Sequence, residues 1–182
     1  AVNAGNKVKI IQAGALKPIL RLLSESTVKV KENACAALQN LSVNLECKNL
    51  IIDEGGVRLL VQLLQAPVPS IQEHASGTMR NLSSVDEAHN TIVFEGGLPP
   101  LINLLRSPMN DIREHVTVTI RHLSANPGNR DKVVKEGGIF PLIELLKSDN
   151  DDIKEQAAGA LHNLAIDPDS RGVIVSKHGL PL

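Results

Sequence analysis

The apolar residues of this chain follow the spacing of amphipathic helices. Four apolar positions between residues 71 and 82 are separated by four, four and three residues, which places them on one face of an α-helix. They are Ile71, Ala75, Met79 and Leu82. The same pattern occurs 41 residues earlier, at Val30, Ala34, Leu38 and Leu41. The spacing predicts long amphipathic helices that recur along the chain.

Two short markers recur with the same step of 41 residues and define a sequence repeat. The first is a glycine pair, found at Gly55-Gly56, Gly96-Gly97 and Gly137-Gly138. The second is a triplet, found at Asn40-Leu41-Ser42, Asn81-Leu82-Ser83, His122-Leu123-Ser124 and Asn163-Leu164-Ala165. Because no insertion or deletion interrupts this register, every repeat is expected to fold in the same way.

Each repeat is predicted to contain three helices. A short first helix carries two adjacent β-branched residues, such as Ile51-Ile52, and ends at the glycine pair, where glycine adopts a left-handed conformation at little cost. A second, leucine-rich helix has a proline in its first turn, at Pro18, Pro100 and Pro141. The third helix is the longest and carries the apolar spacing described above.

Such a unit cannot bury its apolar face alone, so stacked neighbours bury it between them. We therefore expect an all-α fold, a right-handed α-solenoid superhelix built as one array from 41-residue three-helix repeats. The expected repeats are 1–41, 42–82, 83–123 and 124–164, with 165–182 as the start of a fifth, truncated repeat. Since neither end carries a polar capping repeat, we expect a fragment of a longer protein; end-to-end self-association of the chain is the alternative explanation.

The composition narrows the class of protein. The 19 basic and 20 acidic residues give a net charge of −1, which argues against nucleic acid as a partner. Cys35 and Cys47 are too few for a disulfide framework, and Cys35 lies among alanines as a core residue. No apolar run is long enough to span a membrane, and the first residues lack the basic-then-apolar pattern of a signal peptide. We expect an intracellular protein of the cytoplasm, the nucleus or both.

No pattern in the sequence indicates catalysis or a bound cofactor. His115 and His122 are seven residues apart on one predicted helix, so their α-carbons are about 10 Å apart, too far for a shared metal. Each glycine pair ends a helix, whereas a phosphate-binding loop opens one after a strand. The sequence therefore predicts a protein that is not an enzyme and binds no metal or cofactor.

The repeat resembles the armadillo repeat in its three helices, its glycine pair, its leucine-rich second helix and its Asn-Leu-Ser triplet. The resemblance covers essentially the whole chain. The segments NKVKIIQAGALKPILRLLSES, NACAALQNLS and EGGLPPLINLLRSP are most similar to the armadillo arrays of plant U-box ubiquitin ligases and of vacuolar-protein-8-like adaptors. The resemblance implies an adaptor that binds an extended or helical segment of a partner protein in a concave groove lined by the third helices.

Asn40, Asn81, His122 and Asn163 hold the same position in the four repeats, which we number zero on the third helix. In armadillo proteins an asparagine ladder at this position holds the main chain of an extended peptide. A carboxamide offers a donor and an acceptor to one peptide unit. His122 departs from the ladder. The alternative is that these amides join one repeat to the next, and the two roles are compatible.

Positions −4, −7 and −11 point in the same direction as position zero. Position −4 is small or apolar, at Ala36, Gly77, Val118 and Gly159. Importin-α-type arrays carry tryptophan there to bind lysines, and this chain has none, which argues against a nuclear-import receptor. We expect the small residues to leave an open floor that admits a large side chain or a partner helix.

The remaining candidate groove residues are polar. Position −7 carries Asn33, His74, His115 and Gln156, and position −1 carries Arg80 and Arg121 in the two middle repeats. One interpretation is that the two arginines pair with the glutamates at position −8, which are Glu32, Glu73, Glu114 and Glu155. The other is that the arginines and nearby histidines form a polar centre for an acidic or carbonyl-rich partner segment.

The sequence supports three functional hypotheses. The first is a protein-interaction scaffold or adaptor. The second is the substrate-recruiting region of a ubiquitin ligase whose U-box lies outside these 182 residues. The third is a self-assembling structural array, which would form oligomers that depend on concentration.

Overall fold

The computed structural model describes residues 2–25 and 27–178, and within these ranges the regular structure is helical, with no β-strand. The chain forms two compact units, residues 1–95 and residues 96–182, which are described separately below as unit 1 and unit 2. No described helix is both long and apolar enough to cross a lipid bilayer.

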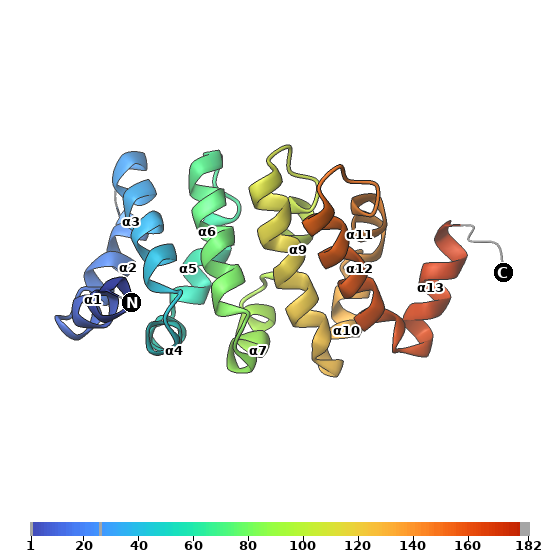
Figure 1. The fold of residues 1–182 in the computed structure, drawn as a ribbon, viewed down its shortest axis with the longest axis horizontal. Coiled ribbons are helices and arrows are strands. Elements are labelled where there is room, and N and C mark those ends of the chain that lie inside the picture. The colour runs from blue at the N-terminus through green and yellow to red at the C-terminus, as the bar shows by residue number, and fades with distance from the viewer. Residues whose placement is uncertain (1, 26, 179–182) are drawn as a thin grey trace. The chain divides into compact units, whose positions relative to one another are not determined.

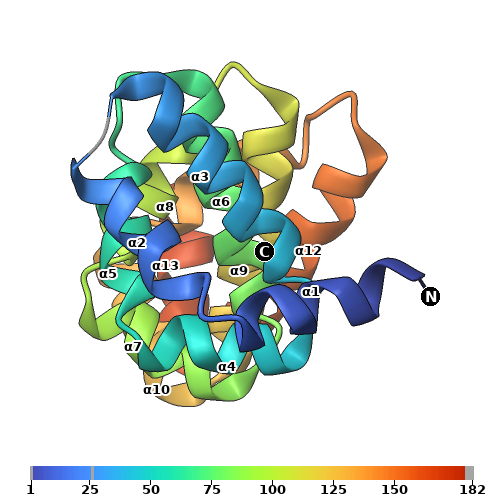
Figure 2. The same cartoon turned by 90° about the vertical axis from the view of Figure 1, so that its left-hand side faces the viewer.

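Unit 1 contains two complete repeats and the first helix of a third (Figure 1). Its helices are α1 (Val2–Gln12), α2 (Leu16–Glu25), α3 (Val28–Leu41), α4 (Leu45–Asp53), α5 (Gly56–Leu63), α6 (Pro69–Leu82) and α7 (Asp86–Phe94). The three helices of the first repeat run in different directions, as Figure 2 shows. The long helices α3 and α6 pack side by side, and α2 and α5 pack against α3 and α6 respectively.

Unit 2 has the same order of first, second and third helices and begins with the second helix of the third repeat. Its helices are α8 (Leu98–Leu104), α9 (Asn110–Ala125), α10 (Pro127–Lys135), α11 (Ile139–Leu145), α12 (Asp151–Ala165) and α13 (Pro168–His178). The long helices α9 and α12 pack against each other, as α3 and α6 do in unit 1. The predicted all-α fold of three-helix repeats is confirmed. The last residues of the predicted fifth repeat, 179–182, lie outside the described part.

The glycine pairs 55–56 and 137–138 end their first helices for two separate steric reasons. The first glycine has a positive φ, 75° at Gly55 and 81° at Gly137, as predicted, and a Cβ atom there would meet open space. The second glycine lies too close to the preceding helix for a side chain. A Cβ on Gly56 would lie 2.7 Å from the carbonyl oxygen of Ile51, and one on Gly138 would lie 3.0 Å from that of Val133. The pair therefore fixes a tight corner between the first and second helices.

The apolar face predicted for residues 71–82 is buried along its whole length in α6. Its counterpart in α3 is buried at Ala34, Leu38 and Leu41, but Val30 is 38% exposed, so the prediction that Val30 belongs to the core is wrong. The first turn of α3 leaves Val30 uncovered, whereas Ile71 at the same place in α6 is 2% exposed.

Asn129 in α10 is a buried polar residue. It is 1% exposed, and neither its Oδ1 nor its Nδ2 atom has a hydrogen-bond partner among the described residues. At the same place in three other repeats stand the smaller residues Cys47, Ala88 and Ser170, and in the first repeat Asn6 is exposed. A buried amide without partners costs about 1–3 kcal/mol of stability.

We predict that Gly137→Ala lowers the free energy of unfolding by about 1 kcal/mol, because alanine at a positive φ is strained even where space is open. Gly172→Ala, within α13 and also facing open space, is the control and should be neutral or slightly stabilising. Urea unfolding followed by circular dichroism measures both variants. Equal effects would contradict the assignment of strain to φ.

We predict that Asn129→Ala raises the free energy of unfolding by about 1 kcal/mol, because it removes the unsatisfied buried amide. Asn103→Ala, at an exposed position of α8, changes the helix propensity in the same way without touching a buried group. A thermal melt of both proteins measures the difference. A lower midpoint for Asn129→Ala than for Asn103→Ala would show that the amide is stabilising.

Candidate peptide-binding surface

The candidate site consists of the outward faces of the third helices, here called the third-helix surface. In unit 1 it lies on α3 and α6, and in unit 2 on α9 and α12, all labelled in Figure 1. The position-zero residues differ in accessibility, since Asn40 is exposed while Asn81, His122 and Asn163 are half-buried.

Asn81 joins the second repeat to the first. Its Nδ2 atom lies 3.3 Å from the carbonyl oxygen of Gln39 and 3.0 Å from the Oγ atom of Ser42, both near the end of α3. The Ser42 hydroxyl donates its own hydrogen to the Gln39 carbonyl at 2.8 Å. The amide thus satisfies a carbonyl group that the helix end leaves without an intrahelical partner.

Asn163 makes the same contacts in unit 2. Its Nδ2 atom donates to the carbonyl oxygen of Arg121 at 3.1 Å and to the Oγ atom of Ser124 at 3.4 Å. The Ser124 hydroxyl again donates to the carbonyl of the residue three positions earlier. The interpretation that these asparagines join successive repeats is therefore confirmed for Asn81 and Asn163.

These networks fix the orientation of each carboxamide. Because a backbone carbonyl and a hydroxyl that donates elsewhere both act as acceptors, the NH2 group of the asparagine faces them. The Oδ1 atoms of Asn81 and Asn163 receive no hydrogen bond from the described residues. The prediction that each amide offers a donor and an acceptor to a peptide is therefore too broad. In Asn81 and Asn163 the Nδ2 donors bond the preceding repeat, and the Oδ1 acceptor has no bond within the described residues.

Asn40 differs from the other two because no described residue bonds its carboxamide. It lines a pocket of about 390 Å³ between α1, α2 and α3. The other lining residues are Asn6, Lys7, Ile10, Ile19, Ala37 and Leu41, so most of the wall is apolar. Asn40 therefore places an amide beside a pocket that has room for an apolar side chain.

The predicted polar positions −1 and −7 contact each other between neighbouring repeats. In unit 1, the Oε1 atom of Gln39 lies 2.8 Å from Nδ1 of His74. In unit 2, Arg121 donates to Oε1 of Gln156 at 2.7 Å, and its guanidinium lies 3.9 Å from the Glu155 carboxylate. The interpretation that Arg121 pairs within the array is confirmed. The other predicted residues lie on the same helices, with Asn33 exposed and Arg80 and His115 half-buried.

The floor predicted at position −4 is not open. Gly77 and Val118 are buried. At Gly159 a Cβ atom would lie 2.7 Å from Nε of Arg121, because the arginine side chain occupies that space. The expectation of an open floor that admits a partner helix is therefore wrong at these three positions. The small residues make room for side chains of the fold itself.

The serine that completes the asparagine network was not predicted from the sequence. Ser42 and Ser124 are both fully buried and accept the amide hydrogen. The signal was present, since serine follows leucine in three of the four Asn-Leu-Ser-type triplets. In the fourth, Ala165 takes its place.

The two cysteines are unpaired and buried. Burial raises the pKa of the Cys35 thiol to about 11, so this group stays protonated and unreactive near neutral pH. Its predicted role as a core residue is confirmed, since its side chain is inaccessible. Among the described residues, no three histidine, cysteine or acidic side chains lie close enough together to hold a metal ion.

The sequence profile of the Armadillo/beta-catenin-like repeat matches residues 3–43, 44–84, 91–125 and 126–166. The chain belongs to this family. The search of curated proteins found no significant match.

Solved structures of two designed armadillo repeat proteins and of one engineered protein are similar to this armadillo chain. A computationally designed protein for modular peptide recognition is 26% identical, with a TM-score of 0.91 over 96% of this chain and 75% of the designed one. An engineered protein is 27% identical, with a TM-score of 0.88 over 97% and 75% of the two chains. A designed armadillo protein in complex with the peptide (KR)4 is 24% identical, with a TM-score of 0.86 over 94% and 73%, and supports the fold alone.

We predict that Asn163→Ala lowers the free energy of unfolding by about 1 kcal/mol, because it removes the bonds from Nδ2 to α9. Asn40→Ala removes an exposed amide that no described residue bonds, and it should leave stability nearly unchanged. Chemical denaturation at equilibrium compares the two. Equal stabilities would mean that the Asn163 contacts contribute nothing to joining the repeats.

Proposed function

We propose that this armadillo chain is a non-catalytic scaffold that binds an extended segment of a partner protein along the third-helix surface of each unit. The observation that carries the proposal is the orientation of the position-zero asparagines. Asn81 and Asn163 are held in place by their Nδ2 bonds, and each leaves an Oδ1 atom without an intramolecular donor. A fixed acceptor lowers the entropy cost of binding a peptide N–H group.

The pocket beside Asn40 supports a bound peptide over a docked helix. A helix keeps its own N–H groups bonded except in its first turn, whereas an extended chain presents free N–H groups along its length. An extended segment that donates to Asn40 would place an apolar side chain near Ile10, Ile19 and Leu41. The similar designed protein made for modular peptide recognition agrees with this mode of binding.

The resemblance of the sequence to plant U-box ligases and vacuolar-protein-8-like adaptors suggests two settings for such a scaffold inside the cell. In one it is an adaptor, and in the other it recruits the substrate of a ubiquitin ligase whose U-box lies outside this chain. Mapping the full-length transcript decides between them. An encoded U-box supports the ligase, and an encoded lipidation signal supports the adaptor.

The test is a selection of random displayed peptides on the purified chain, followed by anisotropy titration of the best binder. We expect Asn40→Ala and Asn81→Ala each to lower the affinity for the selected peptide about tenfold, because each variant loses an acceptor for a main-chain N–H group. Asn103→Ala, on α8 and away from the third-helix surface, is the matched control. All variants are checked for equal helical content before titration.

Two results would count against the proposal. Peptides that bind Asn40→Ala, Asn81→Ala and the wild type equally well would place the binding site on another surface. A selected peptide whose affinity survives N-methylation of every main-chain nitrogen would show that no N–H group is recognised by the asparagine acceptors.

A further inference from the structure

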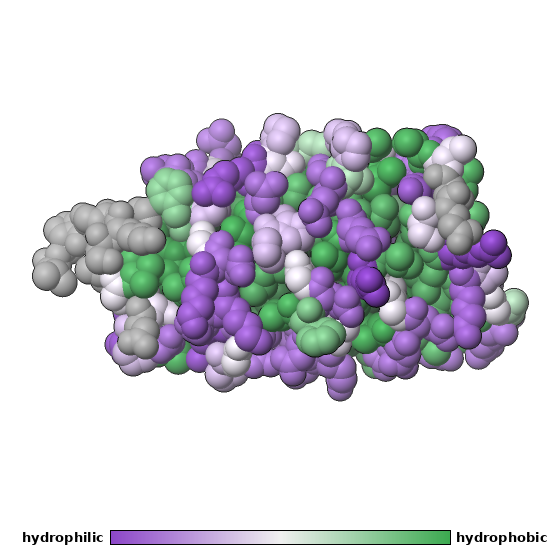
Figure 3. Space-filling view, turned by 180° about the vertical axis from the view of Figure 1, so that it is seen from behind, coloured by the Kyte–Doolittle hydropathy of each residue, from purple (hydrophilic) through white to green (hydrophobic). Residues whose placement is uncertain are grey.

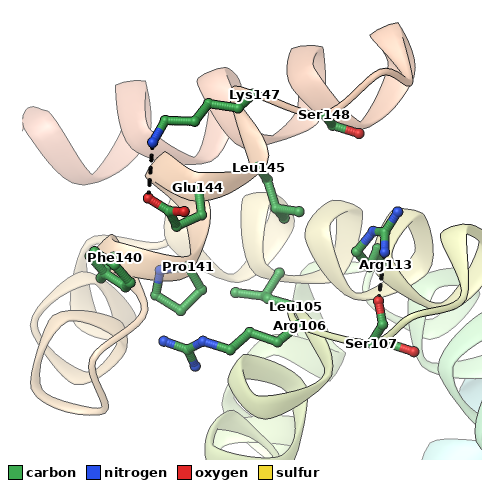
Figure 4. A pocket seen from close by; sticks show the side chains of 10 residues that line it. All are labelled: Leu105, Arg106, Ser107, Arg113, Phe140, Pro141, Glu144, Leu145, Lys147 and Ser148. Carbon is green, nitrogen blue, oxygen red and sulfur yellow. Dashed lines mark hydrogen bonds and ion pairs between the residues drawn. The ribbon is translucent and has the colours of Figure 1, made fainter.

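A second pocket lies away from the asparagine positions, at the opposite end of the second helices. Its volume is about 360 Å³, and it is formed by the end of α8, the start of α9 and the length of α11. Its lining residues, drawn in Figure 4, are Leu105, Arg106, Ser107, Arg113, Phe140, Pro141, Glu144, Leu145, Lys147 and Ser148. The size is at the lower end of ligand pockets, which occupy about 300–1,000 Å³, and suits one apolar side chain with a polar group beside it.

The pocket combines an apolar floor with a cationic edge. Leu105, Leu145 and Pro141 lie at its centre in Figure 4, with Arg106 and Arg113 near them. Apolar surface is also exposed in several places on the face shown in Figure 3. Among the lining residues, Phe140 remains 45% exposed. Leu105, Pro141 and Leu145 are buried beneath it, so the accessible apolar surface of the pocket is mainly the Phe140 ring.

The pocket has three cationic side chains, Arg106, Arg113 and Lys147, which differ in the hydrogen bonds and ion pairs that they make within the fold. Arg113 donates to the Ser107 carbonyl at 2.7 Å and to the Asn110 side chain, so its position is fixed. Lys147 pairs with Glu144 at 3.3 Å, but the lysine side chain is 74% exposed, so this pair contributes little and opens readily.

Arg106 has the most unused bonding capacity. Its guanidinium carbon lies 5.9 Å from the centre of the Phe140 ring, and no described side chain accepts a hydrogen bond from it. The ring orients the guanidinium without using its N–H groups. An anion that enters the pocket therefore finds a pre-positioned planar donor, which matches the geometry of a carboxylate.

The equivalent place in unit 1 shows what is special about this pocket. A pocket of about 350 Å³ there shares seven lining positions with the pocket in unit 2, each offset by 82 residues, or two repeats. Leucine is kept at Leu23 and Leu63, and Lys31 stands where Arg113 does. Ser24, however, stands at the place of Arg106, and Arg58 and Gln65 stand at the places of Phe140 and Lys147. Of these two pockets, only the one in unit 2 has the Arg106–Phe140 pair and a lysine at position 147.

We infer that the unit 2 pocket binds an acidic segment of a partner protein, in which an apolar side chain lies next to an aspartate or glutamate. The apolar side chain packs on Phe140 above the buried floor of Leu105, Leu145 and Pro141, and the carboxylate accepts hydrogen bonds from Arg106. Lys147 exchanges Glu144 for the incoming carboxylate. Arginine and aromatic residues together are enriched where protein interfaces gain most of their affinity.

A carboxylate fits this pocket better than the more highly charged alternatives. Glu144 lines the same cavity and repels an entering dianion such as a phosphorylated side chain more strongly than a single carboxylate. Nucleic acid is disfavoured as a ligand because the basic residues are concentrated at this pocket, whereas the chain as a whole carries a charge of −1. Charge complementarity therefore points to an acidic peptide.

The test uses a displayed library of random peptides, selected in parallel on the wild-type chain and on Arg106→Ser, which introduces the residue found at the same place in unit 1. Lys132→Ser, which removes an exposed cation from α10 outside the pocket, is the matched control. We expect sequences with an apolar residue beside Asp or Glu to be enriched on the wild type and on Lys132→Ser, but not on Arg106→Ser.

Anisotropy titrations of one enriched peptide then measure the effect. We expect Arg106→Ser to weaken binding about tenfold, and the Glu→Gln or Asp→Asn form of the peptide to bind wild type about as weakly. Asn40→Ala and Asn81→Ala should leave this peptide's affinity unchanged, which separates the pocket from the third-helix surface. Equal binding to Arg106→Ser and Lys132→Ser would overturn the inference, as would tighter binding of a phosphoserine form than of the carboxylate form.

Discussion

The structure depends on the packing of the two long third helices against each other within each unit. A single repeat presents an apolar face that it cannot cover by itself, and burial of this face is completed where α3 meets α6 and where α9 meets α12. Burial of apolar side chains supplies most of the favourable free energy of folding. The same packing that buries the apolar face of a third helix also fixes the direction of its outward polar residues. Every candidate binding residue on these helices is held by an element whose other face is part of the core.

Much of the fold follows from the sequence because a repeat shows its pattern several times. The glycine pairs predicted the corners between first and second helices, and the two glycines act differently, Gly55 through its positive φ and Gly56 through lack of space for a side chain. Val30 shows the limit of this inference. Its spacing matches that of Ile71, yet it is exposed, since periodicity gives the direction of a side chain and not what covers it.

The candidate site was harder to predict than the fold. Helical geometry put Asn81 and Asn163 on the correct helices, but which amide atom remains available depends on the serine and carbonyl of the preceding repeat. The small residue Gly159 indicated an open floor, whereas the side chain of Arg121 occupies that space. The pocket of α8 and α11 has no motif, because its residues come from segments that only the fold brings together.

In the proposed binding mode, Asn81 and Asn163 bond the preceding repeat through Nδ2 and the peptide through Oδ1, which couples peptide binding to the contact between repeats. In a chain of hydrogen bonds, a donor that engages Oδ1 polarises the amide and strengthens the bonds that Nδ2 makes. The Asn163 side chain would then act as a sensor, because α9 and α12 are held more tightly when its acceptor is filled. In the proposed binding mode, a bound peptide would therefore stiffen the contact between α9 and α12.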